Sequence, residues 1–138
     1  MKIHTTNYKN TFIEIADDCP VEMAEVPQMK GDKKSIAVMQ FEMLIKNPYT
    51  FTSDDVLFQI YAERNDFTAQ ELPLEREKFF SKGQACFRAS PLAKRYGYGV
   101  HSDKEGRLAI YGAESVEYAE LVKDPNVAKV KAMRSKRV

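Results

Sequence analysis

In the first 50 residues, the order of apolar and polar positions predicts a strand, then a loop, then a helix. Residues 11–16 (TFIEIA) alternate closely enough to predict a strand, which ends at the following acids and proline. Residues 21–31 contain a proline and several acids, so we expect a loop whose apolar residues fold back over the core. Residues 32–46 predict a largely buried helix that Asp32 caps and Asn47, followed by proline, ends.

The next stretch fits two patterns. Residues 55–63 (DVLFQIYAE) alternate and are rich in β-branched and aromatic side chains, which favours a central strand. Thr52 and Asp55 could instead form a capping box before a helix, so that alternative stays open. Residues 68–81 predict a helix opened by a second capping box, with Pro73 distorting or delaying its first turn.

The sequence after residue 82 holds the clearest turn signals. Ser90, followed by proline, predicts the start of a short helix, and Gly97 is placed to end it. Residues 98–102 and 107–111 then predict a hairpin, because Gly106 supplies the left-handed residue that such a turn requires.

Two more helices complete the predicted set. Residues 113–123 form the first, and the second starts at Asp124 with Val127, Val130 and Met133 along one side. Taken together, the elements predict a single α+β domain over residues 1–138, with a mainly antiparallel sheet of about four strands packed against helices.

Composition agrees with a folded domain that lies outside the membrane. The chain of 138 residues is 43% hydrophobic and 30% charged, which is typical of a globular protein. It contains no apolar run of the roughly 20 residues that span a bilayer, and its first residues lack the apolar core of a signal peptide. Cys19 and Cys86 are too few for a disulfide framework, so we expect a reducing cytoplasm.

Charge is distributed unevenly between the two halves of the chain. Residues 1–81 hold 9 Lys and Arg against 14 Asp and Glu, a net charge of −5. Residues 82–138 hold 12 against 6, a net charge of +6. This asymmetry favours either an anionic partner for the second half or attraction between two faces of one domain.

The residues around Ser90 form a candidate anion site. A helix start presents free N–H groups and the positive end of a dipole, and an arginine can bind phosphate or carboxylate with two parallel hydrogen bonds. Strand alternation places Gly97, Gly99 and His101 on one face that is nearly bare of side chains. The same glycines could instead serve close packing, with the cations solvated. The predicted ligand-binding residues are Arg88, Ser90, Lys94, Arg95, Gly97, Gly99 and His101.

Two other classes of function remain open. The first is an enzyme that uses His101 as a base or Cys86 as a nucleophile. The second is an interaction module that binds nucleic acid through the tail at 129–137, which carries five cations and no acid, or a partner protein through exposed aromatic side chains. The pI near 7.7 argues against nucleic acid. No metal-ligand spacing or nucleotide-binding motif occurs, so we expect neither metal nor cofactor. The oligomeric state has no signature in the sequence.

The chain as a whole resembles a small bacterial family that is catalogued as a domain of unknown function. The resemblance implies no activity, cofactor, partner or catalytic residue. It rests on the segments His4–Tyr8, Asn10–Glu14, Lys30–Lys33, Thr52–Phe58, Phe79–Gln84, Cys86–Leu92, Lys94–Gly97, His101–Ser102 and Lys131–Lys136.

Overall fold

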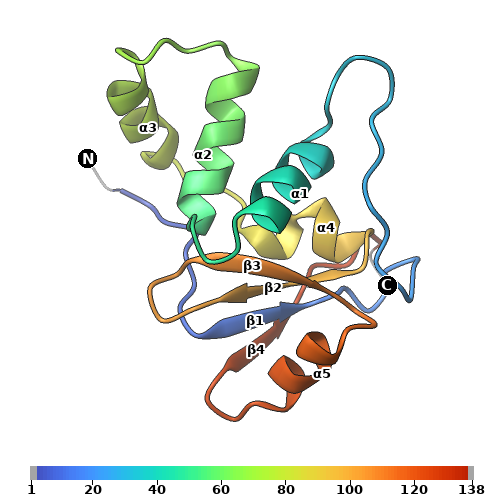
Figure 1. The fold of residues 1–138 in the computed structure, drawn as a ribbon. Coiled ribbons are helices and arrows are strands. Elements are labelled where there is room, and N and C mark those ends of the chain that lie inside the picture. Colours follow the sequence, from blue (N-terminus) through green and yellow to red (C-terminus); the bar gives the residue numbers. More distant parts are fainter. Residues whose placement is uncertain (1–2, 137–138) are drawn as a thin grey trace.

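A four-stranded sheet with the strand order β3-β2-β1-β4 forms the centre of the protein (Figure 1). In the computed structural model, which describes residues 3–136, β1 and β2 pair antiparallel, as do β2 and β3, whereas β1 and β4 pair parallel. The predicted α+β class and the mainly antiparallel sheet are therefore confirmed. The strands are β1 Thr11–Glu14, β2 Tyr98–Ser102, β3 Leu108–Gly112 and β4 Ala128–Lys131.

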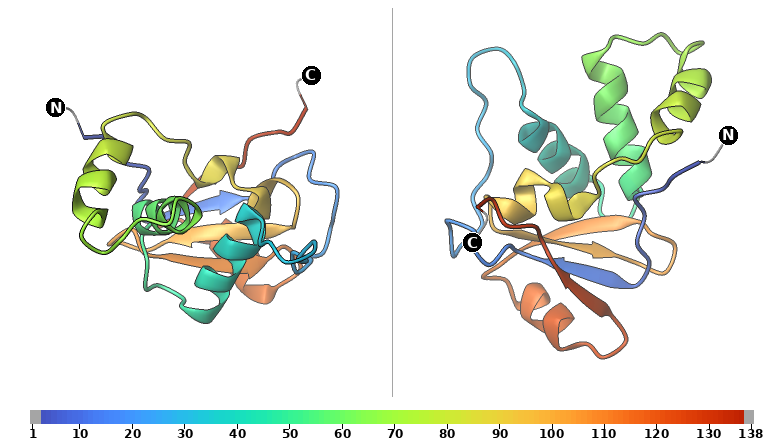
Figure 2. Two further views of the ribbon diagram at one scale, coloured as in Figure 1. Left: turned by 90° about the horizontal axis from the view of Figure 1, so that it is seen from above. Right: turned by 180° about the vertical axis from the view of Figure 1, so that it is seen from behind.

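Helices cover the two faces of the sheet unequally. α1, α2 and α4 lie on one face, α3 packs beside α2, and α5 lies on the other face (Figures 1 and 2). The helices are α1 Ile36–Lys46, α2 Ser53–Arg64, α3 Leu72–Phe80, α4 Pro91–Lys94 and α5 Val116–Lys123.

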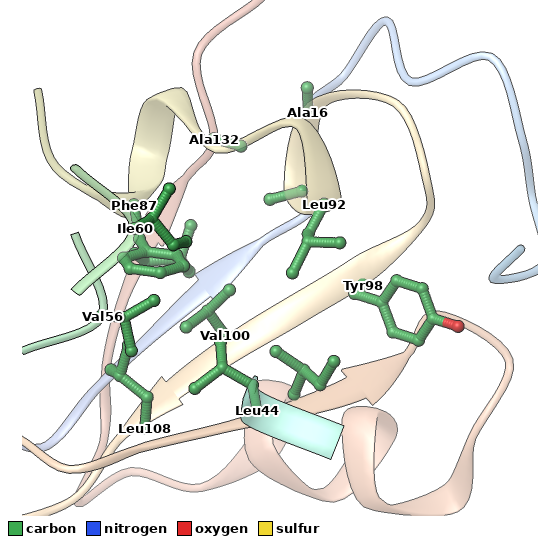
Figure 3. Packing of buried hydrophobic residues seen from close by; sticks show 13 residues of the cluster. Ala16, Leu44, Val56, Ile60, Phe87, Leu92, Tyr98, Val100, Leu108 and Ala132 are labelled. Atoms are coloured by element: carbon green, nitrogen blue, oxygen red, sulfur yellow. The ribbon is translucent and has the colours of Figure 1, made fainter. Parts of the chain in front are cut away.

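The main core fills the space between the sheet and the first group of helices (Figure 3). Ile13, Val100 and Leu108 contribute from the strands, and each is at most 1% exposed. Leu44 and Leu92 meet them from α1 and α4 and are buried to the same extent. Removing this apolar surface from water is the dominant stabilising contribution, at about 25 cal/mol per Å².

The prediction of a strand over residues 55–63 is wrong, because this stretch lies in α2. Val56 and Ile60 face the main core, while Phe58 and Ala62 face a second cluster formed with α3. Each pair is four residues apart and so lies on one side of a helix. Because the two pairs are offset by two residues, apolar side chains occupy every second position from 56 to 62, which is the pattern expected of a strand. The capping box formed by Thr52 and Asp55 is present in the structure and starts this helix.

The last predicted helix is also wrong, because residues 128–131 form β4. The N–H of Ala128 donates to the carbonyl of Asn10, and the N–H of Ala132 donates to that of Glu14. These bonds complete the open edge of β1, and pairing with that edge overrides the local helical pattern. Met133, expected to face inward from a helix, is 52% exposed.

Two smaller expectations in the first half differ from the structure, and a third agrees with it. α1 begins at Ile36 and is capped by Ser35, whose Oγ accepts from the Val38 N–H, rather than by Asp32. Met23, Val26 and Met29 of the loop 21–31, which were expected to cover the core, are 64%, 53% and 48% exposed. α3 begins only at Leu72, which agrees with the delayed start expected from its proline.

Predictions based on short-range turn chemistry are confirmed. Ser90 caps α4, and Gly97 at φ +80° follows its end. The hairpin of β2 and β3 turns through Gly106, which adopts φ +84°. The helix expected from residue 113 begins slightly later, where Ser115 caps α5 through the Tyr118 N–H.

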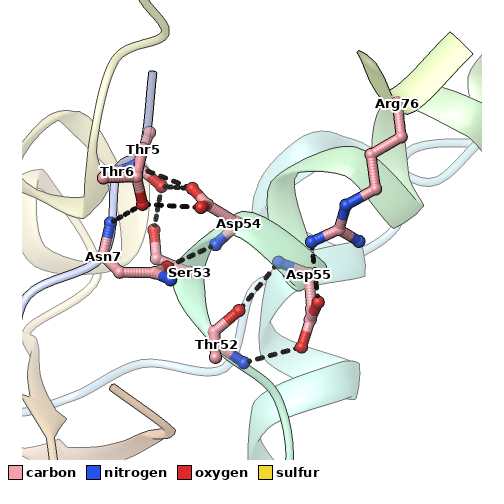
Figure 4. Close-up of polar contacts among 8 residues, drawn as sticks. All are labelled: Thr5, Thr6, Asn7, Thr52, Ser53, Asp54, Asp55 and Arg76. Carbon is pink, nitrogen blue, oxygen red and sulfur yellow. Dashed lines mark hydrogen bonds and ion pairs between the residues drawn. The ribbon is translucent and has the colours of Figure 1, made fainter. Parts of the chain in front are cut away.

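A polar joint connects the N-terminal segment to the start of α2 (Figure 4). The Asp54 carboxylate accepts from Thr5 Oγ1 at 2.6 Å and from the N–H and Oγ1 of Thr6, each at 2.7 Å. The Asp54 N–H in turn donates to Asn7 Oδ1 at 2.9 Å, and Thr6 Oγ1 also contacts Ser53 Oγ. Since this segment leads directly into β1, the joint fixes α2 relative to the sheet.

We expect Asp54→Ala to lower the free energy of unfolding by about 2 kcal/mol, because it removes three hydrogen bonds to a charged acceptor. Urea unfolding followed by circular dichroism measures the change. The control is Glu77→Ala, which removes an exposed carboxylate on α3. Equal midpoints for the two variants would contradict a structural role for the joint.

Candidate functional site

The residues that the sequence groups into one anion site occupy different places in the structure. Arg88 lies in a 3-10 turn, Phe87–Ala89, and its Nε donates to the Lys131 carbonyl at 2.7 Å. Ser90 is 4% exposed, and its Oγ donates to Gln40 Oε1 at 2.6 Å. Lys94 is half-buried at the end of α4, and Arg95 follows it on the surface.

Gly99 provides close packing under α5. A Cβ at this position would lie 2.3 Å from Phe12 Cζ and 2.7 Å from Tyr118 Cε2. The two rings meet edge to face with centroids 4.8 Å apart, and Tyr118 Oη accepts from the Ile15 N–H. The face of β2 that the sequence predicts to be nearly bare of side chains is therefore covered by aromatic rings at Gly99. This agrees with the alternative that the glycines serve close packing. Gly97 is likewise covered, by Val21 and Ala24.

His101 belongs to a hydrogen-bonded trio on the α5 side of the sheet. Tyr49 Oη lies 2.8 Å from His101 Nδ1 and 2.8 Å from Tyr111 Oη. Burial lowers the pKa of His101 below its usual value, an effect only partly offset by the carboxylates of Asp103 and Asp124. Burial and the Tyr111 contact raise the pKa of Tyr49 well above its ordinary range. Both shifts favour the uncharged forms of Tyr49 and His101.

Cys86 and His101 do not form the pair required for thiol catalysis. The Cys86 sulfur lies 3.5 Å from Tyr8 Oη, whereas the imidazole Nδ1 is bonded to Tyr49. The Cys86 contact, together with burial, raises the pKa of Tyr8 despite the opposing effect of Arg88. Within residues 3–136, the hydrogen-bond neighbour of the thiol is thus the Tyr8 hydroxyl and not the His101 imidazole.

Acids from the start of the chain accompany the basic tail. Asp17 lies 3.2 Å from Lys131 Nζ and 3.9 Å from Arg134, while Asp18 accepts from the backbone N–H groups of Ser135 and Lys136. Opposite charges from the two halves of the chain thus attract each other here within one domain. This is the second of the two explanations given above for the uneven charge. Arg137, which belongs to the predicted basic segment, lies outside the described residues.

A surface cavity of about 550 Å³ gathers cations from three separate segments. We call it the basic cavity. Lys33 and Lys34 come from the residues before α1, Arg64 from the last turn of α2, and Arg95 from the end of α4. Its remaining lining residues carry no acid and are Ser35, Ile36, Ala37, Pro91 and Tyr96.

Most of these cations lack a charge partner. Lys34 Nζ lies 2.6 Å from Glu42 Oε1, and this contact lowers the pKa of Glu42. Among residues 3–136, no carboxylate lies within ion-pair distance of Lys33, Arg64 or Arg95. A cavity of 300–1,000 Å³ suits a small molecule, and unpaired cations around it favour an anionic one.

Only Arg95 of this cavity belongs to the site predicted from the sequence. Lys33, Lys34 and Arg64 were missed because they are remote from Arg95 along the chain. A signal does exist in the sequence, since Lys33 and Lys34 directly precede the Ser35 cap. That position brings basic side chains to the positive end of a helix, where they are unfavourable unless an anion joins them.

The described residues contain neither a cluster of metal ligands nor a membrane-spanning helix. Between residues 3 and 136, no three His, Cys, Asp or Glu side chains are grouped as metal ligands. None of the helices in that range has the length and apolar character needed to cross a bilayer.

Comparison with known proteins identifies the family of the chain. The model of a family of unknown function (DUF6157) matches residues 3–138. The chain belongs to this family. No curated protein and no solved structure shows significant similarity to it. The family shown agrees with the resemblance noted from the sequence, and the functional assignment has to come from the site itself.

We expect Gly99→Ala to destabilise the protein by about 1–3 kcal/mol, because the new methyl group would displace the rings of Phe12 and Tyr118. Gly83→Ala is the matched control, since nothing lies within 4 Å of a Cβ at that position. Urea unfolding compares the two variants. If both unfold at the wild-type midpoint, Gly99 is not needed for this packing.

We expect His101 to titrate below pH 6.5, its ordinary value, in the folded protein, because burial disfavours the imidazolium. Protons then bind the unfolded chain preferentially. The contribution of His101 to stability is thus full above pH 6.5 and is lost as the pH falls through its folded-state pKa.

The measurement is an NMR titration of the His101 ring protons, combined with urea midpoints of wild type and His101→Gln at several pH values. The variant should lose less stability than wild type on acidification. A folded-state midpoint at or above 6.5 would refute the role of burial.

Proposed function

We propose that the protein is a binding module that takes up a small anionic or phosphorylated ligand in the basic cavity. The observation that carries this proposal is the convergence of Lys33, Lys34, Arg64 and Arg95 on one cavity whose lining contains no acid. Cations brought together in this way repel one another, and an anion between them relieves the repulsion.

The geometry suits a phosphate or carboxylate group. Arg64 and Arg95 each offer a planar fork of donors that matches two oxygens of such a group, while lysine adds a mobile point charge. The first residues of α1, Ile36 and Ala37, also line the cavity, and within residues 3–136 their N–H groups make no hydrogen bond. Free N–H groups at the start of a helix add favourable partial charge.

The proposal keeps the ligand class expected from the sequence but moves the site. Arg95 remains a ligand-binding residue, whereas Ser90 precedes the lining residue Pro91 and its hydroxyl is bonded to Gln40, outside the basic cavity. Arg88 and His101 are not among the lining residues of the basic cavity. Arg88 donates to the Lys131 carbonyl instead, and the His101 ring is hydrogen-bonded to Tyr49. A site assembled from helix ends thus replaces a site built on one loop.

We also propose that the module works in the cytoplasm of a bacterium. Cys19 and Cys86 are free and partly exposed, which suits a reducing compartment. The bacterial origin rests on the family resemblance alone.

We expect Arg95→Glu to weaken the binding of pyrophosphate by about tenfold or more, since a charge-assisted hydrogen bond contributes about 1.5–3 kcal/mol. Isothermal titration calorimetry at low and moderate salt measures the dissociation constants of inorganic phosphate, pyrophosphate, citrate and a short oligonucleotide. Lys104→Glu is the control, because it makes the same change in net charge on an exposed hairpin turn.

The control should bind like wild type once salt screens long-range attraction. Equal weakening by both variants would show that net charge, rather than the basic cavity, attracts the anion. Tight binding of the oligonucleotide alone would favour the nucleic-acid alternative instead. Binding of none of the anions would remove the proposed function.

A further inference from the structure

A second cavity, of about 350 Å³, adjoins the basic cavity, and Ile36 and Arg64 line both. We call it the apolar cavity. It lies between α1, α2 and the residues around Ala85, and its walls include Leu57, Ile60 and the ring of Phe79. The two cavities thus place an apolar surface directly beside unpaired cations.

The walls of the apolar cavity contain hydrophobic groups left open to solvent. Ile36 is 42% exposed and Tyr61 is 37% exposed. The Tyr61 ring lies against that of Phe79, with centroids 4.6 Å apart. Flat aromatic and branched aliphatic walls of this kind bind rings or acyl chains, which gain stability by leaving water.

Gln40 supplies an independent sign that a ligand enters the apolar cavity. Its side chain is 3% exposed yet lines the cavity, and its Oε1 accepts from Ser90 Oγ. Among residues 3–136, its Nε2 makes no hydrogen bond. Every fully enclosed polar side-chain atom in that range has a partner, so this Nε2 is not fully enclosed. The Nε2 is therefore accessible, and because Gln40 lines the apolar cavity we infer that this donor faces it, where a carbonyl or ether oxygen could accept from it.

We propose that the ligand is an amphiphilic anion. Its phosphate or carboxylate lies in the basic cavity, and its acyl or aryl body fills the apolar cavity beside Gln40. This inference rests on the proposed function, because the head group is held by the cations described above. Arg64 stands at the junction, where its guanidinium can bind the head group while its aliphatic stem contacts the body.

The test compares three probes by isothermal titration calorimetry on the full chain: inorganic phosphate, hexyl phosphate and hexanol. We expect hexyl phosphate to bind about tenfold more tightly than phosphate or better, because each buried methylene adds to the affinity. In Ala85→Trp the indole should fill the apolar cavity, abolish this gain and leave phosphate binding unchanged. Ala69→Trp, on an exposed loop, is the matched control and should behave like wild type.

A second measurement locates the body of the ligand independently of the tryptophan variant. The side-chain amide signals of Gln40 and the ring signals of Tyr61 should shift in NMR spectra with hexyl phosphate but not with phosphate.

The outcomes separate the two proposals. If phosphate binds and hexyl phosphate binds no more tightly, the amphiphilic ligand is excluded while the proposed function stands. If hexanol binds as tightly as hexyl phosphate, the anionic head contributes nothing and the inference fails; if inorganic phosphate also fails to bind, the proposed function fails with it. Retention of the gain in a folded Ala85→Trp, without shifts at Gln40, would also overturn the inference.

Discussion

The position of α2 depends on the hydrogen bonds of one carboxylate. Asp54 ties the first turn of this helix to the N-terminal segment, two threonines of which donate to its oxygens. The same segment continues into β1, the strand on which the sheet is assembled. A helix anchored at its start can extend away from the sheet while its last turn, with Arg64, still holds a defined place. Both cavities depend on that placement.

α2 also has two buried sides, which explains why the protein has two apolar clusters. One side packs on the sheet through Val56 and Ile60, and the other packs on α3 through Phe58 and Ala62. Between these sides, Leu57 and Tyr61 face the apolar cavity. The helix thus belongs to the core, to the α2–α3 pair and to the candidate site at once, so a change on one side affects the other two.

The sequence predicts the features that depend on neighbouring residues and misses those that depend on distant ones. The Ser90 cap, the Gly106 turn and the hairpin follow from local backbone chemistry, and they are confirmed. β4 depends on an edge of β1 more than a hundred residues earlier, so its local pattern is misleading. The basic cavity escapes prediction for the same reason, since Arg64 and Arg95 become neighbours only when α2 and α4 pack on one face.

The parallel pairing of β1 and β4 has a consequence for synthesis of the chain. β1 is synthesised well before either of its neighbours in the sheet, since β2 begins at Tyr98 and β4 at Ala128. Phe12 and Ile13, which are at most 1% exposed in the folded protein, therefore lack these neighbours until both strands have been made. Long-range pairing of this kind slows folding and exposes the nascent chain to aggregation. The sheet thus forms as one unit once β4 has been made, and a chain that lacks β4 leaves β1 without a neighbour on one side.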